Sequence, residues 1–335
     1  MRAYQVVSPD GPSALQAVDL PEPQPGPGEI AVAIRAASLN YRDLLVANGG
    51  YPRNDRRPVV PLSDGAGEVT AVGDGVTRWK VGDRVAPNFM RDWLGGAIHD
   101  RALNSSLGGG IDGVLAETVV LPEASVVAIP EHLSFTQASA LPCAALTAWN
   151  ALNAAGVGAG DTVLLLGTGG VSIFGLQFAK AMGATAIVTS SSDDKLDRAK
   201  QLGADHTVNY KQHPEWHEPV RRLTADRGVD AVLEVGGAGT LERSLQAVRI
   251  GGHVALIGLL AKTETQPSIL SALLNAQTIH GIYVGSVETF EAMNRAITAH
   301  RLEPVIDRNF SFDDAIAAYD YFASQRHLGK VIIEF

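Results

Sequence analysis

Cysteine is nearly absent from this sequence: Cys143 is the only one among 335 residues. A single cysteine excludes an internal disulfide framework and any zinc lobe built from several cysteines. Long apolar runs are also missing, since none reaches the ~18 residues of a membrane-spanning helix. The first residues, MRAYQVVSPDGPSALQ, are too polar for a signal peptide. We therefore expect a soluble cytoplasmic protein without a membrane partner.

Excess positive charge is lacking as well. The chain carries 27 basic and 36 acidic side chains, which gives a net charge of −9. An acidic surface repels nucleic acid and anionic membranes, so we expect neither as a main partner. What is present is ordinary globular composition, 46% hydrophobic and 19% charged, in a chain long enough for two domains with sizeable cores.

Two different patterns divide the chain. Up to residue 121, short apolar runs such as EIAVAIRAA and GEVTAVG are separated by the turn-forming PGPGE and GDG, which predicts a compact, mostly antiparallel β domain. From Gly160 onward, apolar runs alternate with helical periodicity, which predicts βαβ units and a parallel sheet covered on both faces. The tail, DDAIAAYDYFASQRHLGKVIIEF, predicts a helix and a strand that returns to the first domain. The fold class is therefore α/β.

A glycine-rich turn follows the first strand of the second domain, where TVLLLG runs into GTGGVS and a helical pattern begins at once. Gly167 would close the tight turn, and Gly169 would let the backbone approach a pyrophosphate, onto which the helix would direct its free N–H groups. The alternative is a turn without a ligand, but the spacing of strand, turn, helix and second strand favours a dinucleotide site. The predicted contacts are Gly167, Gly169, Gly170 and Val171.

The second strand of that domain ends in three serines, within AIVTSSSDDK. An NAD-specific site places Asp or Glu on the ribose 2′-hydroxyl about 20 residues after the glycines. Ser190, Ser191 and Ser192 leave that position neutral, and Lys195, one helical turn further on, can neutralise a 2′-phosphate. The sequence therefore favours NADP(H) over NAD(H). The alternative is that the serines only cap the helix that DDK begins, and the two roles are compatible.

These parts occur in a characteristic order, with GDGVTRWKVGDRVAP after the β runs and ASALPCAALTAWNAL before the nucleotide domain. In this order the whole chain resembles the medium-chain dehydrogenase/reductase superfamily, and most of all its zinc-free branch of quinone-oxidoreductase-like and NADP-dependent alcohol dehydrogenase-like proteins. The resemblance implies a GroES-like catalytic domain at 1–121, completed by about 302–335, a Rossmann NADP(H)-binding domain at 122–301, and a cleft between them. It also implies a homodimer that pairs Rossmann edge strands, here QTIHGIYVG.

The resemblance also locates the positions where zinc-bearing members hold their catalytic metal. In this chain they carry Asn40, Ser63 and Cys143, with Asp64 beside the second. Asn and Ser are poor ligands for Zn²⁺, which takes thiolate, imidazole or carboxylate. The segment that would form a structural zinc lobe, 88–113, has no cysteine. We therefore expect no zinc, and weak metal binding by Asp64 with Cys143 is the alternative.

Without a metal as Lewis acid, the easier reaction is reduction of an acceptor that is already electrophilic, such as a quinone or an α,β-unsaturated carbonyl. The resemblance assigns Asn40 as the donor to the acceptor's oxygen and places Tyr41 over or beside the nicotinamide, where its hydroxyl could also donate a proton. Asp43 matches a family aspartate that either acts there or only braces the loop. The alternative for these residues is a plain strand-to-helix connection with Asn40 as the helix cap.

Further cofactor contacts follow from the resemblance. Tyr210 is placed against the 2′-phosphate or adenine, and Gly236 and Gly258 end parallel strands, where doubly wound sheets bind ligands. Lys330 matches a family glycine-lysine near the cofactor, or is a surface lysine that starts the last strand. The residues expected to border the nicotinamide are Thr147, Val284, Gly285 and Ser286.

Three functions remain open on these grounds. The first is the metal-free NADPH-dependent reductase, with a small electrophilic substrate. The second is a zinc-independent, NADP-dependent alcohol dehydrogenase or aldehyde reductase that uses Tyr41 or a chain of waters for the proton. The third is a non-catalytic NADPH-binding scaffold or sensor. The polar side chains expected near the nicotinamide favour an enzyme over the scaffold.

Overall fold

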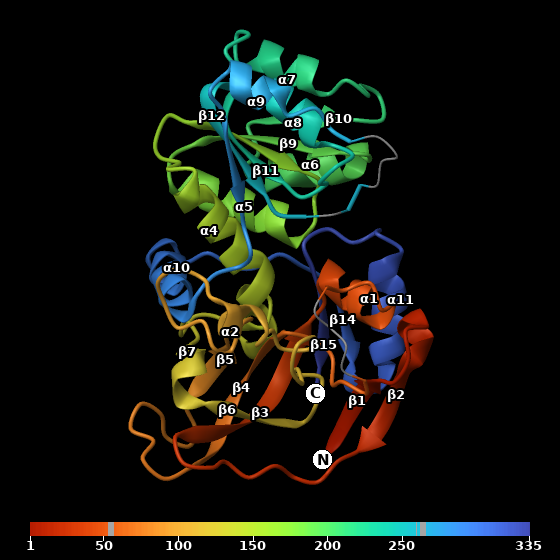
Figure 1. The fold of residues 1–335 in the computed structure, drawn as a ribbon, viewed down its shortest axis with the longest axis vertical. Coiled ribbons are helices and arrows are strands. Elements are labelled where there is room, and N and C mark those ends of the chain that lie inside the picture. Colours follow the sequence, from red (N-terminus) through yellow and green to blue (C-terminus); the bar gives the residue numbers. More distant parts are fainter. Residues whose placement is uncertain (53–56, 259, 262–265) are drawn as a thin grey trace. The chain divides into compact units, whose positions relative to one another are not determined.

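The computed structural model describes residues 1–52, 57–258, 260–261 and 266–335, which form two compact units (Figure 1). Unit 1 comprises Met1–Leu146 and Gly285–Phe335, and unit 2 comprises Thr147–Val284. The α/β class is confirmed, because unit 1 is built on a mainly antiparallel sheet and unit 2 on a parallel one. Among the described residues, no helix combines the length and apolar character needed to span a membrane.

The structure sets the unit boundaries differently from the sequence pattern, which predicts them near residues 121 and 302. Residues 122–146 and 285–301 belong to unit 1. Strand β7 (Val126–Ala128) pairs with β5 (Arg84–Pro87), and helix α10 (Val287–His300) packs against β7. The change of composition near residue 121 marks the end of a β-rich stretch, whereas strand pairing decides which residues fold together.

Unit 1 contains a two-stranded ribbon and a seven-stranded sheet. Besides β5 and β7, its strands are β1 (Arg2–Val6), β2 (Leu15–Asp19), β3 (Glu29–Ser38), β4 (Asp64–Val72), β6 (Thr118–Pro122), β14 (Ile306–Ser311) and β15 (Lys330–Glu334). The sheet order is β14-β15-β3-β4-β5-β7, with β6 also paired to β3. The prediction that the last strand returns to the first domain is confirmed, since β15 pairs antiparallel with β3.

The long strand β3 shows why this segment is extended. Its sequence, EIAVAIRAAS, places the β-branched residues Ile30, Val32 and Ile34 on one face, and all three are buried. The helices of the unit, besides α10, are α1 (Tyr41–Ala47), α2 (Asp100–Leu103), α3 (Phe135–Ala138) and α11 (Ala315–Ala323).

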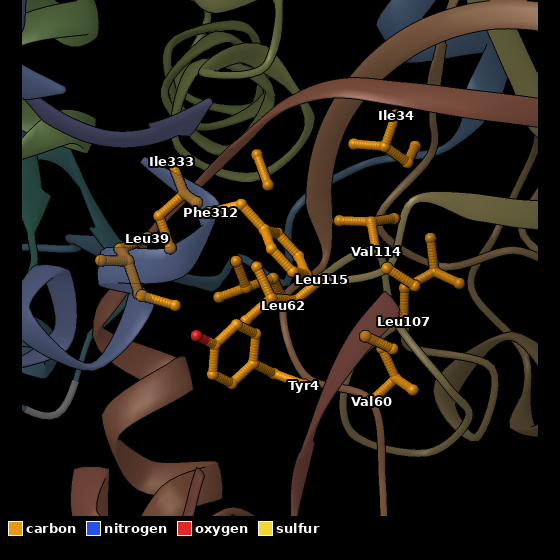
Figure 2. Packing of buried hydrophobic residues seen from close by; sticks show 14 of the residues in the cluster. Tyr4, Ile34, Leu39, Val60, Leu62, Leu107, Val114, Leu115, Phe312 and Ile333 are labelled. Carbon is orange, nitrogen blue, oxygen red and sulfur yellow. The ribbon is translucent and has the colours of Figure 1, made fainter. Parts of the chain in front are cut away.

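The core of unit 1 joins distant parts of the sequence. Figure 2 shows buried side chains of this core, among them Tyr4, Leu115 and Phe312. The Tyr4 and Phe312 rings pack edge to face with their centroids 5.1 Å apart. Burial of side chains of this size stabilises a fold by about 1.5–3 kcal/mol each. This packing holds the N-terminal strands and the C-terminal segment in one unit.

Unit 2 is a six-stranded parallel sheet in the order β10-β9-β8-β11-β12-β13, as the alternation of apolar runs and helices predicts (Figure 1). The strands are β8 (Thr162–Leu166), β9 (Thr185–Ser190), β10 (His206–Asn209), β11 (Val229–Glu234), β12 (Val248–Leu256) and β13 (Thr278–Gly281). The helices are α4 (Leu146–Ala154), α5 (Gly170–Ala181), α6 (Asp193–Gln201), α7 (His217–Leu223), α8 (Leu241–Ala247) and α9 (Leu270–Leu274). Because β8 and β9 are parallel neighbours, the glycine turn and the serines that follow them lie at the same edge of the sheet.

Candidate functional site

The loop between β3 and α1 carries the predicted catalytic residues. Strand β3 ends at Ser38 and helix α1 begins at Tyr41, so Asn40 is the N-cap residue, as the alternative reading expects. The Asp43 carboxylate accepts a hydrogen bond from the Asn40 backbone N–H at 2.7 Å. Burial raises the pKa of the Asp43 carboxyl to about 6, and the Arg42 guanidinium opposes this rise. Asp43 therefore braces the loop, which is one of the two roles left open for it.

The side-chain amide of Asn40 is held at one end only. Its Oδ1 accepts a hydrogen bond from Lys330 Nζ at 2.7 Å, while its Nδ2 has no partner among the described residues. Asn40 is only 8% exposed, and leaving a buried N–H unpaired costs about 1–3 kcal/mol. An oxygen atom of a bound molecule would remove that cost. The loop thus presents one amide donor that no described side chain or backbone group accepts.

Lys330, the first residue of β15, is 2% exposed. Besides Asn40 Oδ1, its ammonium group donates to Leu39 O at 2.8 Å and lies 3.6 Å from Asp64 Oδ2. These three acceptors match the three donors of an ammonium group. The surface-lysine alternative is therefore wrong. Contact of Lys330 with the cofactor stays a prediction.

The positions that hold zinc in metal-bearing members lie around the Asp64 carboxylate. Ser63 Oγ donates to Asp64 Oδ1 at 2.7 Å, and the Cys143 backbone N–H donates to Asp64 Oδ2 at 3.1 Å. Cys143 lies in a π-helical turn, Leu141–Ala145. Burial, together with the negative charge of Asp64, raises the pKa of the Cys143 thiol well above its ordinary value. The cysteine is therefore a neutral thiol.

This set of side chains does not fit a zinc ion. Zn²⁺ is held by thiolates, imidazoles and carboxylates, whereas these positions carry the amide of Asn40, the hydroxyl of Ser63 and the single cysteine, Cys143. The ammonium group of Lys330 already lies against the Asp64 carboxylate and would repel a second cation. In the part of the chain that the structure describes, no group of three or more His, Cys, Asp and Glu side chains could hold a metal ion.

Two tyrosines lie near the loop, and only one was predicted. Tyr41 is partly buried, and it packs against the hydrophobic core of unit 1; its place beside the nicotinamide stays a prediction. Tyr319 of α11 is fully buried, and its hydroxyl has no hydrogen-bond partner among the described residues. Burial, with the nearby charge of Asp43, raises the pKa of Tyr319 well above its ordinary value. No pattern in AIAAYDYFA distinguishes Tyr319 from an ordinary core residue.

In unit 2, the glycine turn between β8 and α5 has the predicted form. Gly167 has a φ of 77°, which favours glycine, and its N–H donates to Thr189 Oγ1 at 3.2 Å. Gly169 is the N-cap residue of α5 and caps it with no side chain, so the amides of Gly170 and Val171 have no intrahelical acceptor. A Cβ built at either of the first two glycines would meet nothing within 4 Å. These features fit a pyrophosphate group.

The three serines after β9 have separate roles. Ser192 is the N-cap residue of α6, and its Oγ accepts from the Lys195 backbone N–H at 3.4 Å, so the capping alternative is confirmed for this residue. Ser190 is buried; its Oγ accepts from the Ser192 N–H at 3.4 Å and its carbonyl from the Tyr210 N–H at 3.0 Å. Ser191 is partly buried. The structure thus gathers the residues predicted to meet a 2′-phosphate at the carboxyl end of β9.

Gly236 and Gly258 have a packing reason of their own. Glu234, which ends β11, is fully buried, and its Oε1 accepts from the Gly236 N–H at 2.7 Å and from the Thr240 hydroxyl at 2.6 Å. A Cβ at Gly236 would lie 2.1 Å from Thr240 Oγ1, and one at Gly258 would lie 2.0 Å from Val235 O. Both turns therefore require glycine without any ligand, and contact of these residues with a cofactor stays a prediction.

The residues expected to border the nicotinamide divide between the two units. Thr147, which is buried, and Val284 belong to unit 2, and the Val284 carbonyl accepts from Asn150 Nδ2 at 2.7 Å. Gly285 and Ser286 belong to unit 1. Ser286 is the N-cap residue of α10, where its hydroxyl accepts a backbone N–H of the first turn. The local structure thus gives Ser286 a capping role, and the nicotinamide contacts stay predictions.

Comparison with known proteins agrees with this arrangement. Residues 26–131 match the alcohol dehydrogenase GroES-like domain, and residues 170–299 match the zinc-binding dehydrogenase family. A zinc-type alcohol dehydrogenase-like protein of Schizosaccharomyces pombe is 47% identical over 315 residues, covering 92% of this chain and 91% of that protein.

Two solved structures resemble the whole chain. A presumptive alcohol dehydrogenase of Sinorhizobium meliloti 1021 has a TM-score of 0.91 and 44% identity, with 100% of this chain and 99% of that chain covered. A quinone oxidoreductase of Coxiella burnetii has a TM-score of 0.82 and 26% identity, with coverage of 100% and 99%. The chain therefore belongs to the medium-chain dehydrogenase/reductase superfamily, a family of oxidoreductases whose dehydrogenases bind NAD(P)(H).

Proposed function

We propose that this protein is a zinc-independent, NADPH-dependent reductase that transfers hydride to an electrophilic acceptor, such as a quinone or an α,β-unsaturated carbonyl. The observation that carries the proposal is the state of Asn40: its buried Nδ2–H has no partner among the residues that the structure describes, and its oxygen is held by the ammonium group of Lys330. A hydrogen-bond donor thus stands where metal-bearing members place a zinc ligand.

The chemistry follows from where charge develops. Hydride addition to a conjugated carbonyl compound or a quinone leaves negative charge on the acceptor's oxygen, and Asn40 Nδ2–H donates to that oxygen. A fixed donor of this kind contributes roughly 10²–10³-fold to turnover. The hydride itself comes from the nicotinamide when NADPH is bound. A quinone or an enone needs no Lewis acid to become electrophilic, which suits a site whose donor to the acceptor is the Asn40 amide.

The nucleotide preference rests on the end of β9. Its last residue, Ser190, is followed by two more serines where a carboxylate would grip an unphosphorylated ribose. The backbone N–H groups of Lys195 and Tyr210 donate to this serine run, the first to Ser192 Oγ and the second to Ser190 O. Hydroxyls can donate to a 2′-phosphate, and a lysine can neutralise it, so this set favours NADPH.

A zinc-independent alcohol dehydrogenase or aldehyde reductase is the second candidate. It is favoured by the names of the relatives, since the proteins from Schizosaccharomyces pombe and Sinorhizobium meliloti are both called alcohol dehydrogenases or alcohol dehydrogenase-like. In this case Tyr41, or a chain of waters, would move the hydroxyl proton. The same Asn40 donor would then hold the oxygen of the aldehyde.

We also propose a homodimer that pairs β13 of two copies. Strand β13 is the edge of the unit 2 sheet, and both its ends, Thr278 and Gly281, are exposed. Near it in the sequence, α9 carries the strongly exposed apolar residues Leu273 and Leu274, and exposed apolar patches mark interaction sites. Light scattering of the purified wild type should give twice the monomer mass. The variant Ile279→Pro, which disrupts the edge strand, should give the monomer mass. We expect a small electrophilic substrate as the other partner, and we expect no nucleic acid or membrane partner. We also expect the protein to act in the cytoplasm.

The decisive experiment is a turnover assay with NADPH against 1,4-benzoquinone, 2-cyclohexen-1-one and a series of aldehydes. We expect NADPH consumption with the first two, and Asn40→Ala should lower kcat by about 100-fold while NADPH binding is unchanged. The matched control is Asn48→Ala, at the exposed C-terminal end of the same helix, which should keep wild-type turnover.

Each other result selects an alternative. Turnover with aldehydes alone would support the second candidate, and NADPH binding without any turnover would indicate a scaffold or sensor. Wild-type turnover of Asn40→Ala would remove the role of this amide. Stoichiometric zinc in the purified protein, with activity lost on chelation, would overturn the zinc-independent mechanism.

A further inference from the structure

Lys330 and Asn40 meet through groups that complement each other in one orientation only. An ammonium group has three donors and no acceptor. Lys330 Nζ donates to Asn40 Oδ1 at 2.7 Å, and turning the amide by about 180° would place its NH₂ group against that cation. The amide oxygen must therefore face Lys330, and the NH₂ group must face away from it.

Lys330 is itself fixed on three sides. Its ammonium donates to Leu39 O at 2.8 Å, and Asp64 Oδ2 lies 3.6 Å away. Asp64 is held in turn by donors from Ser63 and Cys143. Both members of the ion pair are buried, with Lys330 at 2% and Asp64 at 0% exposed. The lysine cannot turn toward another partner without leaving one of its acceptors.

Within this network of described residues, Asn40 Nδ2 is the side-chain donor without a partner. A positive charge against the amide oxygen draws electron density away from the nitrogen, and in a buried setting such polarisation strengthens the N–H as a donor. The same lysine therefore orients the donor and increases its strength.

We propose that Lys330 is a positioning residue of the reductase: it holds the Asn40 amide with Nδ2–H toward the acceptor and strengthens that donor for an oxygen that gains negative charge. This inference rests on the proposed function.

For an enone, the balance is as follows. The hydride lost by NADPH, which becomes NADP⁺, forms a C–H bond at the β carbon. The C=C π pair forms a new double bond between the α carbon and the carbonyl carbon, and the C=O π pair moves onto the oxygen, which gives an enolate. Asn40 Nδ2–H donates to that oxygen. A proton from water then completes the saturated ketone. Lys330 acts only through the Asn40 amide and touches no reacting atom.

The test measures kcat and KM with NADPH and 2-cyclohexen-1-one for the wild type, Lys330→Met, Asn40→Ala and the double variant. Lys330→Met should lower kcat by about 10- to 100-fold, with less than a twofold change in KM for NADPH. In the Asn40→Ala background the same substitution should cause no further loss, because the group that it positions is gone. Lys200→Met, which removes an exposed lysine, is the matched control and should match the wild type.

A second variant and a spectroscopic readout separate positioning from folding. Lys330→Met leaves Asp64 without its cation, so Lys330→Met/Asp64→Asn, which removes both charges, should regain thermal stability and still show the loss of kcat. In protein labelled with ¹⁵N-asparagine, the Asn40 NH₂ signals, identified by their absence from Asn40→Ala, should shift in the charge-neutral double variant. If Lys330 had only a structural role, its replacement would lower the stability of the protein and leave kcat per folded molecule unchanged.

The outcomes distinguish the two proposals. If the wild type does not reduce the enone, or Asn40→Ala keeps full turnover, the proposed function fails and this inference fails with it. If Asn40→Ala loses turnover while the charge-neutral variant keeps it, only the role of Lys330 is overturned. Additive losses in the Asn40→Ala background would also overturn it, since they would show that Lys330 acts independently of the amide.

Discussion

Helices α5 and α6 follow neighbouring strands of one parallel sheet, yet their N-termini are built in opposite ways. Helix α5 begins after Gly169, which has no side chain, and its first turn holds no acidic residue. Helix α6 begins after Ser192, whose hydroxyl caps the helix, and its first turn holds Asp193 and Asp194. Each helix carries partial positive charge at its N-terminus. In α6 the chain's own groups satisfy that charge, whereas in α5 it stays available to an external anion.

Helix α1 of unit 1 adds a third case. Its first turn carries Asp43, whose carboxylate accepts the backbone N–H of Asn40, but this carboxylate is fully buried. Burial makes the cap rigid and raises the pKa of the Asp43 carboxyl to about 6. The three helix starts therefore differ: one is left without a capping side chain, one is capped by its own serine, and one fixes the loop that carries the Asn40 amide.

Closing the open helix start should have the largest effect. Gly169→Asp puts a carboxylate at the N-cap of α5, where the backbone is extended and a Cβ meets nothing within 4 Å. The protein should fold with its stability unchanged or raised by a few tenths of a kcal/mol. NADPH and NADH should both bind about 1000-fold more weakly, since like charges about 4 Å apart repel by about 4 kcal/mol at an intermediate dielectric constant. Fluorescence titration and thermal unfolding measure the two effects.

The matched control for this change is Gly169→Ala, which adds a Cβ without a charge or a cap. It should lower dinucleotide affinity far less than the aspartate does. If the two variants bind equally well, backbone N–H groups of α5 do not receive the pyrophosphate, and the contrast between α5 and α6 has no functional meaning.

The next effect concerns the buried cap of α1. The ordinary pKa of the Asp43 carboxyl is 3.8, and burial raises it to about 6 in the folded protein. The native state then holds this proton more tightly than the unfolded state, so the wild type loses about 3 kcal/mol of stability as the pH rises from about 4 to 6. In Asp43→Asn, whose amide oxygen can still accept the Asn40 N–H, this loss should be absent. Urea denaturation between pH 4 and 8 measures the difference.

Asp92 offers a control of opposite sign. A hydrogen bond from Arg91 lowers the pKa of the Asp92 carboxyl, so its contribution is present above the ordinary pKa and is lost as the pH falls. The wild type should therefore lose stability through Asp92 as the pH falls into the acid range, and this loss should be absent in Asp92→Asn. The change between pH 4 and 6 should be the same in both proteins. A wild-type curve that runs parallel to that of Asp43→Asn over this window would show that Asp43 is ionised in the fold at no cost.

The N-termini of α5 and α6 could both be predicted from the sequence. Glycines after an apolar strand and serines before DDK are local patterns, and backbone geometry follows from them directly. The bracing role of Asp43 was also local, since it lies three residues after Asn40. The parallel sheet was predictable because each strand is followed by its own helix, and neither feature depends on distant contacts.

The rest depended on contacts between distant residues. Lys330 lies 290 positions after Asn40, and GKVII at the start of a strand gives no sign that the lysine is buried. The unit boundary was missed for the same reason, because the pairing of β7 with β5 cannot be read from a change in composition. The packing reason for Gly236 and Gly258 was missed in the same way. A side chain at either position would collide with a neighbouring residue, and the position of these glycines at strand ends does not reveal this.

The smallest expected effect concerns the preference for NADPH over NADH at the end of β9. Ser190→Asp restores the carboxylate of an NAD-type site at the end of β9. NADPH should bind about 30-fold more weakly, because its 2′-phosphate then faces a like charge worth about 2 kcal/mol, whereas NADH should bind as well as before or better. Equilibrium titration of both nucleotides gives the ratio. Equal affinities of the wild type for the two nucleotides would contradict the assignment from the start.

Ser192→Ala separates the two roles of the serine run. Ser192 caps α6, so its loss should lower stability by about 1 kcal/mol and leave the ratio of NADPH to NADH affinity nearly unchanged. If Ser192→Ala instead changed the ratio as much as Ser190→Asp, the cap itself would shape the 2′-phosphate site. In that case the N-terminus of α6, although Ser192 caps it, would also bind the 2′-phosphate. Helices α5 and α6 would then differ only in degree.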